Sequence, residues 1–264
     1  MKKIPALFIT LFLMGSVLGC QATAPAAPGA ATLPPASNPA SISDTAAAPK
    51  YLSLGSATIS ETGKGPDYTM KVTTPVMNGS TDPHVVAFNQ AVSQLVQKQE
   101  AGFKKSLLEV TPSPASPGST FDLKYTLVSQ SAHIVSLQLK MDQYMAGAAH
   151  PLQTSLSFSY DLAKGQEISL DQLFVPGANY LQAISDYCKT TLSKTDLGSV
   201  LFMDGLSPTT DNYRNWNISD QGLVITFDEY QVAPYAAGPQ RVTVPYQALK
   251  DLIAPQGPLA EFNK

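Results

Sequence analysis

The sequence is poor in cysteine, with only Cys20 and Cys188 in 264 residues. So few thiols cannot form the disulfide framework of a small secreted scaffold. Leu181, Ile184 and Cys188 are spaced three and four residues apart, which places Cys188 on the apolar face of a predicted helix. A buried thiol at that position is expected to be an inert core residue and not a catalytic nucleophile.

Histidine is equally scarce, and His84, His133 and His150 lie far apart in the sequence. A zinc site needs three or four His, Cys or carboxylate ligands. The histidines show neither His-x-His nor His-x-x-x-His spacing. We therefore predict no metal and no cofactor.

Charged residues make up only 14% of the chain, and they form no basic run. Lys2 and Lys3 belong to a leader segment described below. Without them the 17 basic residues become 15, against 20 acidic ones, which is a net charge of −5. Nucleic-acid binding requires a basic patch or stripe, so no nucleic acid partner is expected.

Hydrolase motifs are missing as well, since no Gly-x-Ser-x-Gly elbow occurs. Asp228 and Glu229 form the only adjacent acidic pair in a predicted strand-end loop. Neighbouring strand residues point to opposite faces, so this pair is poorly placed to flank one glycosidic bond. The sequence favours a protein without catalytic activity, and the alternative is an envelope hydrolase that modifies glycans.

The N-terminus lacks an apolar run of the 20 or so residues that span a membrane. Lys2 and Lys3 precede a mostly apolar stretch at 4–18, and Val17-Leu18-Gly19-Cys20 resembles a bacterial lipobox. This pattern predicts a lipoprotein signal peptide at 1–19, with cleavage before Cys20 and acylation of that cysteine. An aspartate directly after the cysteine would resemble the signal that retains lipoproteins in the inner membrane, but Gln21 stands there. We therefore predict an anchor in the outer membrane, with the protein facing the periplasm.

Residues 21–50 contain eleven alanines and six prolines and show no periodic apolar face. Such a composition cannot bury a core, so 20–50 is predicted to be the lipidated cysteine and a disordered Ala/Pro-rich tether. The rest, 51–264, is long enough for one sizeable domain. We divide it into an N-terminal helix-and-strand half at 51–143 and a C-terminal half at 144–254.

The apolar pattern of this domain predicts an α+β fold, an antiparallel sheet covered by a few helices. Apolar alternation predicts strands near 68–74, 121–127, 135–141, 152–160, 223–227 and 242–244. Helical spacing predicts helices near 83–108, 177–194 and 246–253, with a short helical turn within 168–174. The alternating strands should have one dry face under the helices and one wet face. Trp216 is expected in the core.

Three stretches in order carry a family resemblance. They are Tyr144–Pro151 (YMAGAAHP), Tyr160–Phe174 (YDLAKGQEISLDQLF), and Pro234–Pro239 (PYAAGP) followed by 242–246 (VTVPY). They resemble the RsiV C-terminal domain, a domain of unknown function that also stands next to the PdaC deacetylase domain. A mycobacterial secreted immunogenic antigen is similar too, down to Asn212-Tyr-Arg-Asn215. The chain departs from the Gly-Gly-x-His-Pro signature at Ala148, which would be costly if that position needs a positive φ.

The resemblance implies an α+β domain outside the cytoplasmic membrane that binds a partner, as the RsiV domain binds lysozyme. It carries over neither the deacetylase chemistry nor a sigma-factor-binding segment. The chain is thus expected to be a lipid-anchored cell-envelope protein with a non-catalytic recognition domain for lysozyme, another wall-active protein or peptidoglycan. Besides the hydrolase, the alternative is a structural envelope lipoprotein.

The candidate ligand-contact residues lie in two predicted loops: Tyr144, Gly147, His150, Pro151, Tyr235 and Gly238. His150 precedes a proline, which favours extended backbone, and its imidazole can bond backbone groups that an irregular loop leaves unpaired. It is therefore structural or in contact with a ligand. Tyr230 and Tyr235 suit either a core edge or a partner surface. No residue is expected to be catalytic.

Overall fold

The computed structural model describes residues 53–111, 117–260 and 262. The predictions of a signal peptide, of Cys20 acylation and of a tether at 20–50 lie outside these residues. None of the helices in the described part is both long and apolar enough to cross a membrane.

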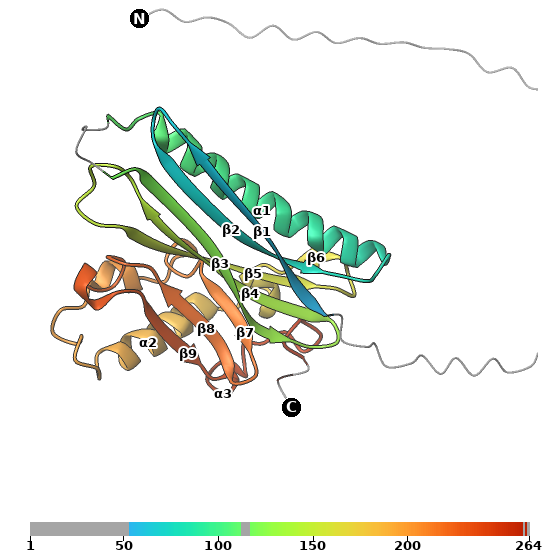
Figure 1. The fold of residues 1–264 in the computed structure, drawn as a ribbon. Coiled ribbons are helices and arrows are strands. Elements are labelled where there is room, and N and C mark those ends of the chain that lie inside the picture. The colour runs from blue at the N-terminus through green and yellow to red at the C-terminus, as the bar shows by residue number, and fades with distance from the viewer. Residues whose placement is uncertain (1–52, 112–116, 261, 263–264) are drawn as a thin grey trace, which may run out of the picture. The chain divides into compact units, whose positions relative to one another are not determined.

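A six-stranded sheet dominates the fold (Figure 1). Its strands lie in sequence order: β1 (Leu54–Gly63), β2 (Tyr68–Met77), β3 (Ser119–Gln130), β4 (Ile134–Tyr144), β5 (Leu152–Asp161) and the short β6 (Gln166–Glu167). Every neighbouring pair is antiparallel except β2 and β3, which run parallel because α1 connects them.

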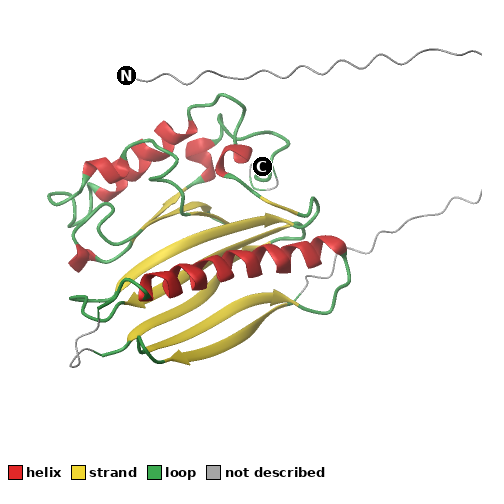
Figure 2. Ribbon diagram, turned by 90° about the horizontal axis from the view of Figure 1, so that it is seen from above, coloured by secondary structure: helices red, strands yellow, loops and turns green. Residues whose placement is uncertain are grey.

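Helix α1 (Pro83–Leu107) covers one face of this sheet (Figure 2). It begins where the sequence predicts, because the Asp82 side chain accepts the His84 N–H and Pro83 occupies the first turn. Its apolar face, including Phe88 and Phe103, packs on the dry sides of β2 to β5. Phe88 lies edge-on to Tyr160, with ring centroids 5.4 Å apart.

A second sheet of β7 (Trp216–Ser219), β8 (Gly222–Phe227) and β9 (Gln240–Val244) is antiparallel throughout. Its apolar face packs against α2 (Tyr180–Leu192) and α3 (Tyr246–Leu249) and forms a separate hydrophobic core. Trp216 belongs to this core, as predicted. Cys188 is buried on α2, and burial raises the pKa of its thiol to about 12, which suppresses the reactive thiolate.

The two sheets meet through polar side chains. Ser136 and Ser159 share a hydrogen bond of 2.8 Å, and the Asn217 amide donates to Ser136 Oγ at 3.0 Å. Gln138 donates to Thr226 Oγ1 at 2.7 Å. The predicted wet face of β4 and β5 is therefore largely covered by the second sheet. Ser136 and Ser159 are buried there, and each has a hydrogen-bond partner.

The α+β fold class is confirmed, while several boundaries differ from the sequence prediction. β1 was not predicted, and β2 continues through Pro75. Proline is tolerated there because β2 pairs with β3 only as far as Val72, so the missing N–H has no strand to face. The short strands β6 and β7 were also missed, and α3 is shorter than expected.

Candidate functional site

The β4–β5 connection and the segment after β8 meet at one end of the large sheet. They bring together His150, Pro151, Tyr230 and Tyr235, which we call the aromatic corner. His150 stacks on Tyr235 with ring centroids 3.9 Å apart and an interplanar angle of 28°. The Tyr230 and Tyr235 rings lie 5.5 Å apart. The corner is therefore a continuous surface of three rings.

Hydrogen bonds fix the His150 ring in one tautomer. Its Nδ1 lies 2.8 Å from the Pro151 carbonyl oxygen, which can only accept, so Nδ1 carries the proton. Nε2 of the neutral ring is then an acceptor, and the Tyr230 hydroxyl donates to it at 3.1 Å. The Tyr235 hydroxyl donates to the same Pro151 carbonyl at 3.2 Å. All three rings are thus oriented by one another or by backbone.

Three turns at the corner each contain a residue with positive φ. In the first, Ala148 N–H donates to the Met145 carbonyl at 2.9 Å, and Gly147 takes φ 90°. Ala148 is not strained, because its φ is not positive: among the described residues other than glycine, only Tyr230 has a positive φ. Gly238 has φ 63° and ψ −173°, a combination that is essentially restricted to glycine.

The second turn, 228–231, places tyrosine where glycine is favoured. Gln231 N–H donates to the Asp228 carbonyl at 3.1 Å, and Tyr230 at the third position has φ 63°. A bulky side chain in this region costs on the order of 1 kcal/mol. The Tyr230 side chain is nevertheless 50% exposed, so burial does not account for its presence.

Replacing Tyr230 should separate backbone strain from side-chain contacts. Tyr230→Ala and Tyr230→Gly both remove the ring, but only glycine relaxes at positive φ. We expect Tyr230→Gly to be more stable than Tyr230→Ala by about 1 kcal/mol in urea unfolding. Equal stability of the two variants would contradict the left-handed turn.

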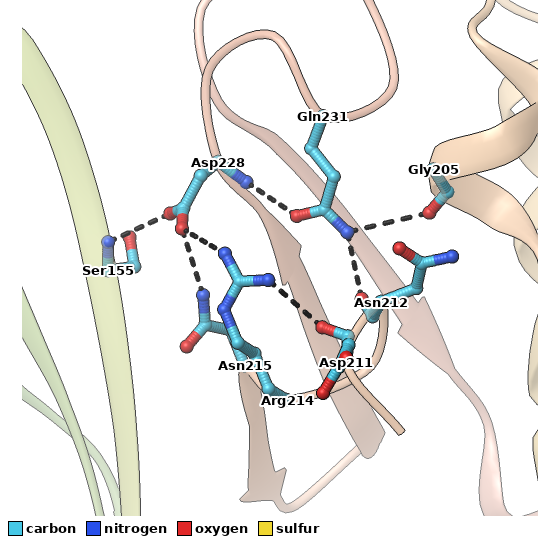
Figure 3. Close-up of polar contacts among 8 residues, drawn as sticks. All are labelled: Ser155, Gly205, Asp211, Asn212, Arg214, Asn215, Asp228 and Gln231. Carbon is cyan, nitrogen blue, oxygen red and sulfur yellow. Dashed lines mark hydrogen bonds and ion pairs between the residues drawn. The ribbon is translucent and has the colours of Figure 1, made fainter. Parts of the chain in front are cut away.

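Beneath the corner, the Asp228 carboxylate links three segments (Figure 3). Its Oδ1 accepts the Ser155 N–H at 2.8 Å, whereas Oδ2 accepts from Arg214 Nη2 at 3.1 Å and from Asn215 Nδ2 at 3.2 Å. Asp228 is buried, while the Arg214 side chain is 53% exposed. Burial raises the pKa of Asp228, and the bonds from Ser155 and Arg214 oppose that shift.

Asp228 and Glu229 both bond to the edge of β5. Glu229 Oε2 accepts the Gln153 N–H at 2.9 Å, two residues before the N–H that Asp228 accepts. β5 pairs with β6 only at Tyr160 and Asp161, so these N–H groups lie on an otherwise open edge. The two carboxylates therefore tie the segment after β8 to the edge of β5.

Gln231 extends this network to the Asn212–Asn215 stretch (Figure 3). Its Oε1 accepts the Asp228 N–H at 3.2 Å, and its Nε2 donates to the Asn212 carbonyl at 2.8 Å. The Asn212 amide in turn donates to the carbonyls of Asp204 and Ser207. The asparagines singled out by resemblance thus hold the loop that carries Tyr230.

Of the six candidate loop residues, the structure brings His150, Pro151 and Tyr235 into direct contact, while Gly147 and Gly238 shape the turns. Tyr144 ends β4 opposite Thr120, and no described ring contact joins it to His150. Tyr230, which the sequence named as suited to a core edge or a partner surface, joins them at the corner, whereas Asp228 and Arg214 were not among the candidates for this site. Their sequence signal was weak, because the contacts span up to 80 residues.

The other two histidines lie apart from the corner. His84 Nδ1 bonds the Leu162 carbonyl at 3.0 Å and fixes the start of α1 to the β5–β6 turn. The His133 carbonyl accepts the Leu162 N–H at the start of β4. Within the described ranges, no three His, Cys, Asp or Glu side chains gather as a metal site.

Residues 171–247 match the model of the family described as "Protein of unknown function (DUF3298)". The matched stretch includes Asp228, Arg214, Asn215 and Tyr235 but neither Ser155 nor His150. The solved structure of a DUF3298 family protein (PA4972) from Pseudomonas aeruginosa PAO1 has a TM-score of 0.58 at 16% identity, covering 79% of this chain and 97% of that one. This likeness supports the fold assignment.

Three curated relatives are similar in sequence. Peptidoglycan-N-acetylmuramic acid deacetylase PdaC of Bacillus subtilis is 25% identical over 198 residues, 71% of this chain and 42% of PdaC. Esterase Rv3036c of Mycobacterium tuberculosis is 34% identical over 119 residues, 44% of this chain and 51% of the esterase. Immunogenic protein MPT64 of the same species is 31% identical over 111 residues, 41% of this chain and 48% of MPT64.

These matches confirm the resemblance drawn from the sequence to the domain of unknown function, to PdaC and to the mycobacterial antigen. The chain spans only about half the length of the curated relatives it matches, between 42% and 51%.

Proposed function

We propose that this chain, which carries a DUF3298 domain at 171–247, is a lipid-anchored cell-envelope protein that recognises a wall-active protein such as lysozyme through its aromatic corner. Acylation of Cys20 would hold the chain at the outer membrane, facing the periplasm. The folded part would then present the corner to molecules of the cell wall without altering them.

The observation that carries the proposal is the strained, half-exposed Tyr230 in a surface of three rings. Backbone strain is retained in proteins where the conformation serves a site. Tyrosine is enriched at the energetic centres of protein interfaces, because its rigid ring buries a large area at low entropic cost. Fixing the rings by hydrogen bonds lowers the ordering cost of binding further.

Charge and similarity support a partner from the wall. The chain without Lys2 and Lys3 has a net charge of −5, which favours encounter with a basic protein. PdaC is by name a deacetylase of peptidoglycan, and it is similar to 71% of this chain. Peptidoglycan itself is therefore the second ligand to test at the corner.

The similarity to Esterase Rv3036c favours a second candidate, an esterase centred on His150. His150 Nε2 is positioned to accept a proton from the Tyr230 hydroxyl, and the Pro151 carbonyl orients the imidazole ring. In an esterase of this kind, Tyr230 would be the nucleophile, His150 the base and the Pro151 carbonyl the orienting group. A phenol is a less usual nucleophile than serine. None of the described serines donates a hydrogen bond to a histidine ring in the structure.

The binding proposal is tested with the soluble fragment 51–264, because both hydrophobic cores lie within 54–262. The immobilised fragment is expected to retain lysozyme at low salt. Tyr230→Ala should weaken the dissociation constant at least about tenfold, the loss expected for an interface anchor. Tyr180→Ala, which changes the tyrosine at the start of α2, outside the aromatic corner, is the matched control and should bind as wild type.

Two further assays separate the remaining functions. Sedimentation with purified peptidoglycan that depends on Tyr230 would make the glycan the ligand of the corner. Hydrolysis of p-nitrophenyl acetate that His150→Ala abolishes would establish the esterase instead. If the fragment is inert in all three assays, the result would favour the third reading, a structural envelope lipoprotein.

A further inference from the structure

A groove lies at the end of the large sheet opposite the aromatic corner. β4 and β5 are antiparallel, so His150 follows one end of β4, whereas Ile134 and Asp161 lie at the other. The groove encloses about 870 Å³ between the β5–β6 turn, the start of α2 and the C-terminal segment 254–258. It shares no residue with the corner.

The walls of the groove are held by hydrogen bonds. The Asp161 carboxylate accepts the N–H groups of Ala163 and Lys164 at 2.9 and 3.0 Å, which fixes the β5–β6 turn. Backbone bonds of 2.8 and 3.0 Å join Val175 to Leu252 and Ala254 to Leu173. The groove is therefore formed before any ligand binds, as most small-molecule sites are.

Two aromatic rings, of Phe174 and Tyr180, and several amides line the interior. Tyr180 is half-buried and stacks on Phe174, with centroids 4.5 Å apart and nearly parallel planes. Gln166, Gln256 and Asp171 lie around it with exposed side chains. Asp171 accepts from Ser169 Oγ through one carboxylate oxygen. Burial, and then the charge of Asp171, raise the pKa of Tyr180, so the phenol stays protonated and can donate.

The charges of the lining argue against an anionic ligand. Lys164 is its only cation, and that ammonium is paired with Asp161 at 3.2 Å. Asp171 leaves the lining with one net negative charge. Phosphate or carboxylate groups would find no available partner of opposite charge in this groove.

The hydrogen-bonding groups also argue against a proline-rich peptide. A polyproline helix lacks the N–H donors that the amide carbonyls of Gln166 and Gln256 and the carboxylate of Asp171 would need after losing water. Sugar hydroxyls and acetamido N–H groups donate and accept, and the face of a sugar ring can cover Tyr180. The lining therefore matches a neutral saccharide.

The groove adjoins a second hollow, which favours an extended ligand. A second hollow of about 230 Å³ shares Asp161, Lys164, Gly257 and Pro258 with the first and continues to His133. Gly257 permits this shape, since a Cβ there would lie 2.8 Å from the Ala254 side chain. The two hollows form one channel across the end of the sheet.

We propose that this channel, lined by Tyr180, Asp171, Gln166 and Gln256, binds a short stretch of a neutral glycan with acetamido groups. The site does not rest on the proposed function of the corner. The Tyr180 ring covers one sugar face, and the amides and carboxylate bond its hydroxyl and acetamido groups. Binding involves no covalent step.

The test titrates the full chain, purified in detergent, with chitotetraose in a calorimeter. Wild type is expected to bind, and Tyr180→Ala to weaken the dissociation constant at least about tenfold, because the stacked ring is lost. Tyr180→Phe should stay within about threefold of wild type. Because Tyr180→Ala also removes packing on Phe174, the exposed pair Gln166→Ala/Gln256→Ala serves as a second variant and should weaken binding several-fold.

The Tyr230→Ala variant distinguishes this proposal from the one for the aromatic corner. It should bind chitotetraose as wild type does. The proposal is overturned if wild type does not bind chitotetraose, if Tyr180→Ala and the glutamine pair both bind normally, or if a proline-rich decapeptide competes for the channel. Loss of binding in Tyr230→Ala alone would assign the glycan to the corner and also overturn it.

Discussion

Replacing Asp228 by alanine is expected to lower the free energy of unfolding by about 4 kcal/mol, the largest effect of any single change at the site. Removing the carboxylate leaves the Ser155 N–H and the Asn215 amide buried without their acceptor. Each unpaired buried donor costs about 1–3 kcal/mol. Arg214 adds little to the loss, because its half-exposed guanidinium regains water.

The Asp228→Ala change should disturb the aromatic corner more than it disturbs the two hydrophobic cores. Asp228 directly follows β8 and begins the turn that carries Tyr230. We therefore expect Asp228→Ala to reduce partner binding as strongly as Tyr230→Ala. The loss of about 4 kcal/mol should lower the melting temperature by about 8–16 °C for a domain of this size.

Asp211→Ala is the matched control, since Asp211 is exposed and contributes only its backbone carbonyl to Arg214. It should change the unfolding free energy by no more than about 0.5 kcal/mol. Similar losses in Asp211→Ala and Asp228→Ala would show that Asp228 does not link the three segments.

The raised pKa of Asp228 adds a dependence on pH. Folded protein holds this proton more tightly than unfolded protein, so the group favours folding at acidic pH. Its contribution falls as pH rises from the ordinary carboxyl range through the raised pKa. Subtracting the stability profile of Asp228→Asn from that of wild type should isolate this downward slope, and a difference that rises with pH would contradict it.

The sequence was most informative where packing is local and periodic. α1 was predicted almost to the residue because a capping aspartate, a proline and apolar spacing all agree. The alternating runs of β3, β4 and β5 were equally plain. β1 was missed because Leu54–Gly63 contains mainly small and polar residues, as suits an exposed edge strand without a buried face.

The polar faces of β4 and β5 show what a strand pattern leaves undetermined. Ser136, Ser157 and Ser159 alternate as solvent-facing residues do, yet they meet a second sheet. Alternation reports which face is apolar and cannot distinguish water from a polar protein surface. Likewise, the histidine-proline corner was visible in sequence, whereas its partner Tyr230 lies 80 residues away.

Asn217 is the residue on which the contact between the two sheets is expected to depend most. Its amide donates to Ser136 Oγ at 3.0 Å and to the Leu137 carbonyl at 2.7 Å, and its Oδ1 accepts from Ser157 at 3.0 Å. The side chain is fully buried. We expect Asn217→Ala to cost about 3 kcal/mol, because the Leu137 carbonyl and the Ser157 hydroxyl lose their partner without gaining water.

The way in which this variant unfolds is as informative as its stability. Each sheet has its own hydrophobic core, so a weakened polar contact between them should allow the smaller sheet to unfold first. Trp216, the only tryptophan, lies next to Asn217 in the core of the three-stranded sheet and reports that unit. In wild type, tryptophan fluorescence and far-ultraviolet circular dichroism should change together in urea.

In Asn217→Ala, the fluorescence transition should come at lower urea than the circular dichroism transition. Asn179→Ala is the control, because Asn179 is exposed and makes no side-chain capping bond at the start of α2. It should leave the two transitions coincident. Coincident transitions in Asn217→Ala, with a loss below about 1 kcal/mol, would mean that apolar packing and not the polar contact joins the two sheets.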